Sequence, residues 1–243
     1  MIQPQLPENV RRIEADETFC FSCHPEVDCF TDCCRQLELA LTPYDVLRLK
    51  QETGLDSSTF LEQYVIQEQE PEDIFPRFYL TMVDDGQASC VFVSDSGCTV
   101  YPGRPGACRA YPMGRAAMRR DDNSIDEFFV LLSEPHCHGF QEKEEQTTAI
   151  YSEGQGLERY NRVNDKVATL LQHEKIRQGM QLTKEQTELF ILALYDLDSF
   201  RKRLNEGKLP QHEQYSTQKD ICKDDEQLLL FGISWLHGVL FQK

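Results

Sequence analysis

The chain has 243 residues, of which 40% are hydrophobic and 27% are charged, a balance typical of a folded soluble protein with one large or two small domains. The net charge is -16 and the pI is about 4.8; an acidic surface repels phosphate, so nucleic acid and anionic membranes are not expected as partners. Residues 1–16 lack the apolar core of a signal peptide, and no apolar run reaches the roughly 18 residues of a membrane helix, so we expect a cytoplasmic location.

The first part of the chain is predicted to contain an arm, a cysteine-rich loop and two short helices. Residues 1–18 are expected to form a flexible N-terminal arm with little structure. The first helix should begin after Thr42, a capping residue, and end at Gly54. A second helix should begin at Ser57 or Ser58. Two short helices joined by a turn could read DNA, but the second helix is not basic, which argues against that function.

The middle of the chain is predicted to form a small antiparallel sheet. Its candidate strands are short and rich in β-branched or aromatic residues, and Asp-Asp-Gly and Asp-Ser-Gly turns separate the first three of them. These strands are Phe78–Val83, Ser89–Val93, Cys98–Tyr101 and Phe128–Leu132.

Helices dominate the remainder of the chain. Leu157–His173 is one candidate, and a capping box at Thr183 precedes an apolar stripe that ends at Gly207. The last helix should start near Asp224, and Cys222 is interpreted as a buried helix cysteine. The whole pattern predicts an α+β fold, in which a cysteine-rich metal-binding core with a small antiparallel sheet is followed by a mostly helical part. The expected domains are the arm 1–18, the metal-binding domain 19–141 and a helical region 142–243 packed on it.

Ten cysteines are the main feature of the composition. In a cytoplasmic chain they stay reduced, so short spacings indicate metal or redox chemistry and not disulfides. Scattered buried cysteines are the plainer alternative, but five of them fall between Cys20 and Cys34. Thiolates bind zinc and iron–sulfur clusters because sulfur is a soft, negatively charged donor, and such a site usually takes four of them. The candidate ligands are Cys20, Cys23, Cys29, Cys33, Cys34, Cys90, Cys98, Cys108 and Cys137.

The adjacent pair Cys33 and Cys34 limits how these ligands can combine. In extended backbone neighbouring side chains point to opposite sides, so two consecutive cysteines need not bind one ion. Either they serve two metal sites, or one binds metal while the other packs.

The cysteine pattern resembles that of a known family. Cys23-x5-Cys29-x3-Cys33-Cys34 is similar to the CxxCxxxCC motif of the YkgJ-type cysteine-cluster proteins, a zinc- or iron-chelating family. The stretch from Cys90 to Pro112 is similar to the family's second block, C-x-F-…-G-x-C-x-I-Y-…-R-P-…-C-R-x-Y-P. The resemblance covers about residues 20–139. It implies metal ligation by Cys23, Cys29, Cys33, Cys34, Cys90, Cys98 and Cys108, with Cys137 as the later cysteine of the family.

The first motif departs from the short form of the family pattern in two ways. Five residues separate Cys23 from Cys29, which is closer to the flagellin lysine N-methylase branch of the family. Cys20 is additional, so either Cys20 or Cys23 is the ligand.

Other candidate site residues carry weaker signals. His24, His136 and His138 could be mixed ligands, although a lone histidine is more often a polar surface group. Arg104 and Arg109 should either donate hydrogen bonds to the cluster sulfurs or pair with acidic residues. No Ser-His-Asp arrangement, phosphate loop or glycine-rich nucleotide motif is found, so the motifs leave enzymatic activity undecided.

These observations predict a protein that holds an iron–sulfur cluster, favoured over zinc, through clustered cysteine thiolates. The resemblance to lysine N-methylases of flagellin implies a protein-modifying enzyme as one alternative. A structural zinc module in an interaction protein is the other alternative. A protein partner or protein substrate is expected in each case, with no nucleic acid and no membrane.

Overall fold

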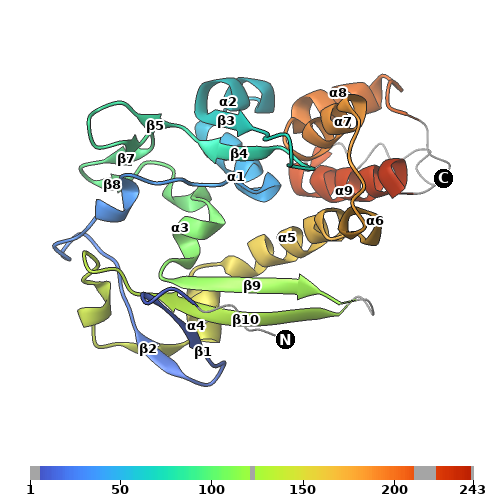
Figure 1. The fold of residues 1–243 in the computed structure, drawn as a ribbon. Coiled ribbons are helices and arrows are strands. Elements are labelled where there is room, and N and C mark those ends of the chain that lie inside the picture. Colours follow the sequence, from blue (N-terminus) through green and yellow to red (C-terminus); the bar gives the residue numbers. More distant parts are fainter. Residues whose placement is uncertain (1–5, 121–123, 211–222, 242–243) are drawn as a thin grey trace. The chain divides into compact units, whose positions relative to one another are not determined.

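The computed structural model describes residues 6–120, 124–210 and 223–241 of the chain (Figure 1). Helices and short antiparallel strands are both present and the C-terminal part is helical, which confirms the predicted α+β class. Within these ranges no helix combines the length and the apolar character needed to cross a membrane.

The structure consists of two compact units, and each unit is made from two separate stretches of chain. The first unit contains Met1–Leu37 and Met82–Arg159, and the second contains Glu38–Thr81 and Tyr160–Lys243. This division differs from the expected boundary at residue 141. The segment 38–81 joins the C-terminal helices because its own two helices pack against helices that come much later in the chain.

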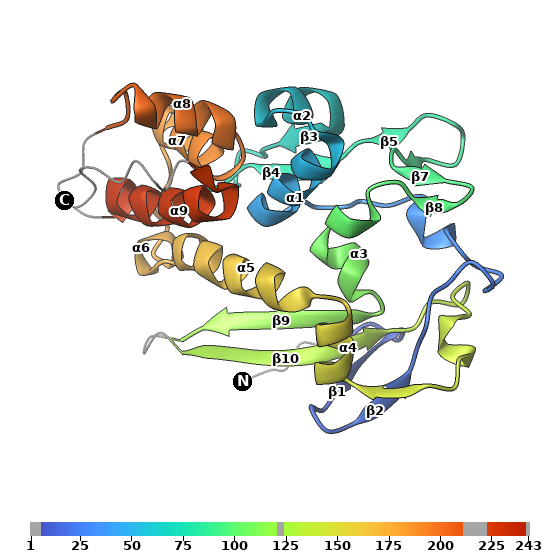
Figure 2. The ribbon, with the colours of Figure 1, turned by 180° about the vertical axis from the view of Figure 1, so that it is seen from behind.

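A three-stranded antiparallel sheet forms the centre of the first unit (Figure 2). The central strand β10 (Ile125–Leu132) pairs with β1 (Val10–Ile13) on one side and with β9 (Met113–Arg119) on the other. The expectation of an unstructured arm over residues 1–18 is therefore wrong for β1. Ile13 is only 2% exposed, so burial of this side chain favours the strand over a free arm.

The core of the first unit lies between this sheet and a second strand pair. Strand β2 (Thr18–Cys20) pairs with β11 (Glu145–Thr147), which leads into α4 (Thr148–Gly154) and the first turn of α5 (Leu157–Leu171). Aromatic rings meet edge to face in this core, where Phe21 contacts three other rings. The buried core residues are Ile13, Phe19, Phe21, Met113, Leu131, Tyr151 and Leu157.

Short elements in the first unit present most of the cysteines. Two tight strand pairs, β5–β6 and β7–β8, follow one another, and short helical turns surround them. Their bounds are η1 Asp32–Cys34, β5 Met82–Val83, β6 Ser89–Cys90, β7 Val93–Ser94, β8 Gly97–Cys98, η2 Tyr101–Gly103, α3 Gly106–Ala110 and η3 Gly139–Gln141.

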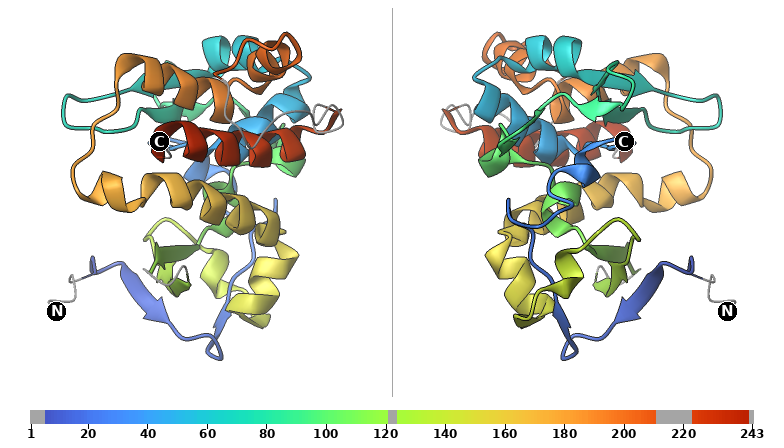
Figure 3. Two further views of the ribbon diagram at one scale, coloured as in Figure 1. Left: turned by 90° about the vertical axis from the view of Figure 1, so that its right-hand side faces the viewer. Right: turned by 90° about the vertical axis from the view of Figure 1, so that its left-hand side faces the viewer.

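The second unit is mostly helical. Helix α9 lies alongside α7 (red and orange in Figure 3), and a Cβ at Gly232 would stand 2.5 Å from the Ala193 carbonyl oxygen, so glycine permits this close approach. The elements are α1 Pro43–Thr53, α2 Ser57–Tyr64, β3 Val65–Glu68, β4 Arg77–Leu80, the greater part of α5, α6 Glu174–Arg177, α7 Lys184–Leu194, α8 Leu197–Asn205 and α9 Asp225–Phe241.

Helix ends in the second unit follow the sequence signals. Thr42 and Asp45 form a capping box on α1, and Gly54 ends that helix with φ of 69°. The predicted capping box at Thr183 is present on α7. The single helix predicted from there to Gly207 is instead two helices, because Asp196 interrupts it and caps α8.

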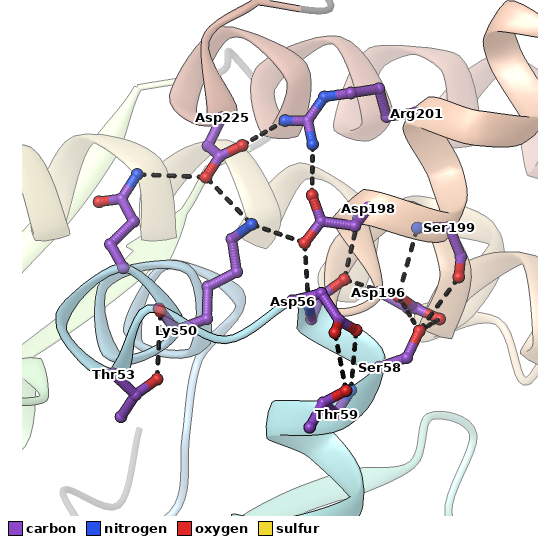
Figure 4. Close-up of polar contacts among 12 residues, drawn as sticks. Lys50, Thr53, Asp56, Ser58, Thr59, Asp196, Asp198, Ser199, Arg201 and Asp225 are labelled. Carbon is purple, nitrogen blue, oxygen red and sulfur yellow. Dashed lines mark hydrogen bonds and ion pairs between the residues drawn. The ribbon is translucent and has the colours of Figure 1, made fainter.

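A charged network joins four helices of the second unit (Figure 4). Lys50 on α1 is almost buried, and its Nζ lies 2.7 Å from Asp198 on α8 and 3.2 Å from Asp225 on α9. Arg201 pairs with the same two carboxylates. Asp198 also accepts the backbone N–H of Ser57 on α2 at 2.8 Å. Burial acts to raise the pKa of Asp198, but the hydrogen bonds from Lys50 and Ser57 together lower it below its usual range.

Replacing Asp198 with asparagine tests how much this network stabilises the fold. We expect the free energy of unfolding at pH 7 to fall by about 1–3 kcal/mol, because Lys50 and Ser57 lose a charged acceptor. Folding lowers the pKa of Asp198, so its contribution is complete above the unfolded pKa of about 3.9 and is lost as the pH falls through the folded value. The stability difference between variant and parent should therefore narrow in acid.

Urea unfolding followed by circular dichroism, at neutral and at acidic pH, measures both effects. Glu62→Gln, on the exposed face of α2, is the control and should change stability by no more than about 0.5 kcal/mol. A stability difference that stays constant or widens toward low pH would contradict the role given to Asp198.

Candidate metal centre

Four cysteines from the first unit line one small cavity. Cys23 comes from the loop after β2, Cys29 and Cys33 from the next turns, and Cys137 from the loop before η3. The sequence separates Cys33 from Cys137 by more than a hundred residues, so folding is what makes them neighbours. The remaining lining residues are Phe21, Ser22, Val27, Tyr111, His136 and Gly139.

Close backbone packing brings the two stretches of this cavity together. The N–H of Ser22 donates to the carbonyl of Gly139 at 3.1 Å. A Cβ at Gly139 would stand 2.5 Å from the Phe21 ring, so the absence of a side chain there allows the contact. The backbone N–H of His138 donates to the Cys29 sulfur at 3.1 Å. Cys23 and Cys29 are thereby held beside the loop that carries Cys137.

The thiol of Cys23 lies close enough to the other three cavity cysteines for their charges to affect it. Partial burial, followed by the neighbouring Cys33, Cys29 and Cys137, raises the pKa of Cys23 to about 11, while the positive charge of Arg104 acts in the opposite direction. A hydrogen bond with Cys34 and then burial raise the pKa of Cys33. Without a cation Cys23 and Cys33 are therefore thiols at neutral pH.

The hydroxyl of Tyr111 also belongs to this cavity. It is buried beside Cys137 and Glu134, and among the described residues it has no hydrogen-bond partner of good geometry. Burial, and then these two neighbours, raise the pKa of Tyr111. No sequence signal marked the Tyr111 hydroxyl as a cavity group.

The other predicted ligands lie outside the lining of this cavity. Cys34 contacts Cys33, while Cys90 and Cys98 sit at the ends of β6 and β8. Cys20 lies on β2, where it pairs with Glu145 of β11. Cys108 is exposed on α3. Cys222, which the sequence analysis interpreted as a buried helix cysteine and not as a ligand, lies outside the described residues.

The predicted histidines and arginines take different positions. His136 lines the cavity, whereas His24 lies 3.5 Å from Glu142 and His138 contributes its backbone N–H. Arg104 is 9% exposed, and its guanidinium donates to the Gln155 side chain and stacks on the Tyr101 ring. Arg109 donates to the backbone carbonyls of Pro102, Arg104 and Gln155, and so holds the segment around Arg104 in place.

The cavity brings four cysteine sulfurs together but does not arrange them in a metal-coordination geometry. In the part of the chain that the structure describes, no three histidine, cysteine, aspartate or glutamate side chains are already placed to hold one metal ion. The donor set itself fits a soft metal, because it consists of four sulfurs. The buried Tyr111 hydroxyl fits as well, because a thiolate ligand would give it a charged acceptor.

Comparison with known proteins gives one match. A scan against protein families matches residues 22–153 to the family described as "CxxCxxCC: Putative zinc- or iron-chelating domain". The match spans just over half of the chain. Searches of curated proteins and of solved structures found no match. The resemblance predicted from the cysteine motifs is confirmed: this chain belongs to the CxxCxxCC family of zinc- or iron-chelating domains.

Proposed function

We propose that this protein holds an iron–sulfur cluster through Cys23, Cys29, Cys33 and Cys137. The observation that carries the proposal is that these four cysteines, drawn from remote parts of the chain, line one cavity. Four thiolates are the ligand set of a four-iron cluster and also of a structural zinc ion. The family match supports metal binding by either zinc or iron.

The surroundings of the sulfurs favour the cluster over zinc. A backbone N–H donates to Cys29, and the positive charge of Arg104 acts on Cys23. Hydrogen bonds and nearby charge set the reduction potential of an iron–sulfur cluster, whereas zinc has no redox state on which they could act. The apolar side chains of Phe21 and Val27 line the cavity and limit solvent access. Solvent access also affects the reduction potential of a cluster.

The proposal places the protein in the cytoplasm, where thiols stay reduced, and gives it a protein partner or a protein substrate. The net charge of -16 disfavours nucleic acid and anionic membranes. Two alternatives keep the same ligands. A protein-modifying enzyme of the lysine N-methylase type should bind S-adenosylmethionine tightly when its metal is loaded. A structural zinc module should lose only folding when a ligand is substituted.

Metal and sulfide analysis tests the cluster directly. Protein purified without oxygen should contain iron and acid-labile sulfide and should absorb broadly in the visible range. Cys23→Ser and Cys137→Ser should lose both the iron and the colour, because each removes one of four ligands. Cys20→Ser is the matched control and should keep both, since Cys20 lies on β2 and outside the cavity lining. A colourless parent protein with stoichiometric zinc would rule out the cluster.

Tyr111→Phe tests whether the buried hydroxyl serves the metal. In the metal-free protein the variant should be more stable by about 1 kcal/mol, because a buried hydroxyl without a partner is costly. Zinc affinity should nevertheless fall about tenfold, because the metal-bound thiolate of Cys137 loses a hydrogen-bond donor. Urea unfolding and competition with a coloured chelator measure the two effects. Tyr79→Phe, in the second unit, is the control and should leave zinc affinity unchanged. If Tyr111→Phe binds zinc as tightly as the parent protein does, the Tyr111 hydroxyl is not a hydrogen-bond donor to the metal-bound thiolate.

A further inference from the structure

We propose that the outer face of the three-stranded sheet in the first unit binds a second copy of this chain and so forms a symmetric dimer. The outer face is the side of β1, β9 and β10 that points away from the core. Its residues are Val10, Arg12, Gly114, Ala116, Met118, Asp126, Phe128, Val130 and Leu132. None of them lines the cysteine cavity, so the dimer does not depend on the proposed cluster.

Strand register and two contacts place these side chains on one face. Each of the three strands contributes a buried residue to the core, and successive side chains of a strand point to opposite faces. The guanidinium of Arg12 lies over the Phe128 ring, 4.9 Å from its centroid. A Cβ at Gly114 would stand 2.9 Å from a methyl group of Val130. Side chains from all three strands therefore meet on the outer face.

The outer face is apolar and open to solvent. Met118 is 63% exposed and Phe128 is 37% exposed, although both are large hydrophobic residues. The small residues Gly114 and Ala116 make β9 low beside the larger side chains of β10. Strand β1 pairs only with Phe129–Leu132, so the part of β10 that carries Phe128 extends beyond it (Figure 1). Exposed apolar surface of this kind is typical of a protein interaction site.

The charges on the outer face favour a second copy as the partner. The face carries one positive side chain, Arg12, and one negative side chain, Asp126, and both are exposed. Their ion-pair neighbours on the same chain, Glu14 and Arg120, keep this balance. The whole chain has a net charge of -16, so two copies repel one another over most of their surface. A face with balanced charge is where two copies can approach at the lowest electrostatic cost.

The two charged residues lie symmetrically about Phe128. Arg12 is the register partner of Val130, two residues after Phe128 on β10, and Asp126 lies two residues before Phe128. A twofold axis that crosses the strands at Phe128, between two facing sheets, therefore brings Arg12 of each copy level with Asp126 of the other. The same ion pair forms twice, and the two Phe128 rings meet at the axis. The outer face is thus complementary to itself.

The same charges select one orientation of the two sheets. A twofold axis along β10 would place Asp126 against its own copy, and like charges repel. The axis across the strands avoids that contact and leaves the strands of the two sheets aligned, which is a common way for sheets to pack face to face. Side chains from both sheets fill the gap of about 10 Å between them.

Sedimentation equilibrium of the full chain, prepared without oxygen, tests the dimer. Over about 1–300 μM, a range that covers weak association, the parent protein should show a monomer–dimer equilibrium. Phe128→Ser should weaken dimerisation at least about tenfold, because both copies lose the ring that packs at the axis. Ile66→Ser, which removes an exposed apolar side chain of β3 in the second unit, is the control and should leave dimerisation unchanged. A parent protein that stays monomeric throughout, or a Phe128→Ser variant that dimerises as the parent does, would overturn the proposal.

Mixing two charge variants tests the symmetric pairing. Arg12→Asp gives an acidic outer face and Asp126→Arg gives a basic one, so each variant alone should dimerise about tenfold more weakly than the parent. An equimolar mixture should recover parental association, because the acidic face of one variant then meets the basic face of the other. A mixture that associates no better than the separate variants would overturn the proposed pairing. Iron and sulfide contents should be the same in all variants, so a failure of the dimer is distinguishable from a failure of the proposed cluster.

Discussion

The contact between Phe21 and Gly139 is the constraint on which the cavity depends. The phenylalanine ring fills the place that a side chain at 139 would take, and the adjacent Ser22 N–H bonds to the Gly139 carbonyl. Only then does the loop with Cys137 reach the turns that carry Cys29 and Cys33. A hydrophobic core contact thus determines which sulfurs become neighbours, and metal binding depends on core packing.

This arrangement also explains why metal and fold should be coupled. Partial burial raises the pKa of Cys23, and repulsion from the neighbouring Cys33, Cys29 and Cys137 raises it further, so this thiol is hard to ionise without a cation. A cation removes that repulsion and links the stretch around Cys23 to the stretch around Cys137. The free energy of binding therefore becomes free energy of folding for the first unit. The apolar contacts of Phe21 hold the same stretches together without metal.

Local signals in the sequence predicted local structure well. The capping residues Thr42 and Thr183 identified the starts of α1 and α7, because a cap acts within one turn of helix. The pairing of β2 with β11 was missed, since it joins residues that are about 125 positions apart and each strand is only three residues long. The break at Asp196 was missed because hydrogen bonds from Ser57 and Ser58 of α2 support it, and the local pattern there is helical.

The same distinction limits what the cysteine motif could predict. Spacing identified the chain as a member of its family, but it could not assign individual cysteines to a site, because both zinc and iron–sulfur clusters accept many spacings. Tertiary contacts distinguish them: Cys23 and Cys137 line the same cavity, whereas Cys20 lies in a strand outside its lining. The Cys33-Cys34 pair shows the reason most directly. One peptide bond separates the two residues, yet Cys33 lines the cavity, whereas Cys34 contacts Cys33 and lies outside the lining. The spacing of a motif therefore does not show which of two adjacent cysteines lines a cavity, because that depends on the fold around them.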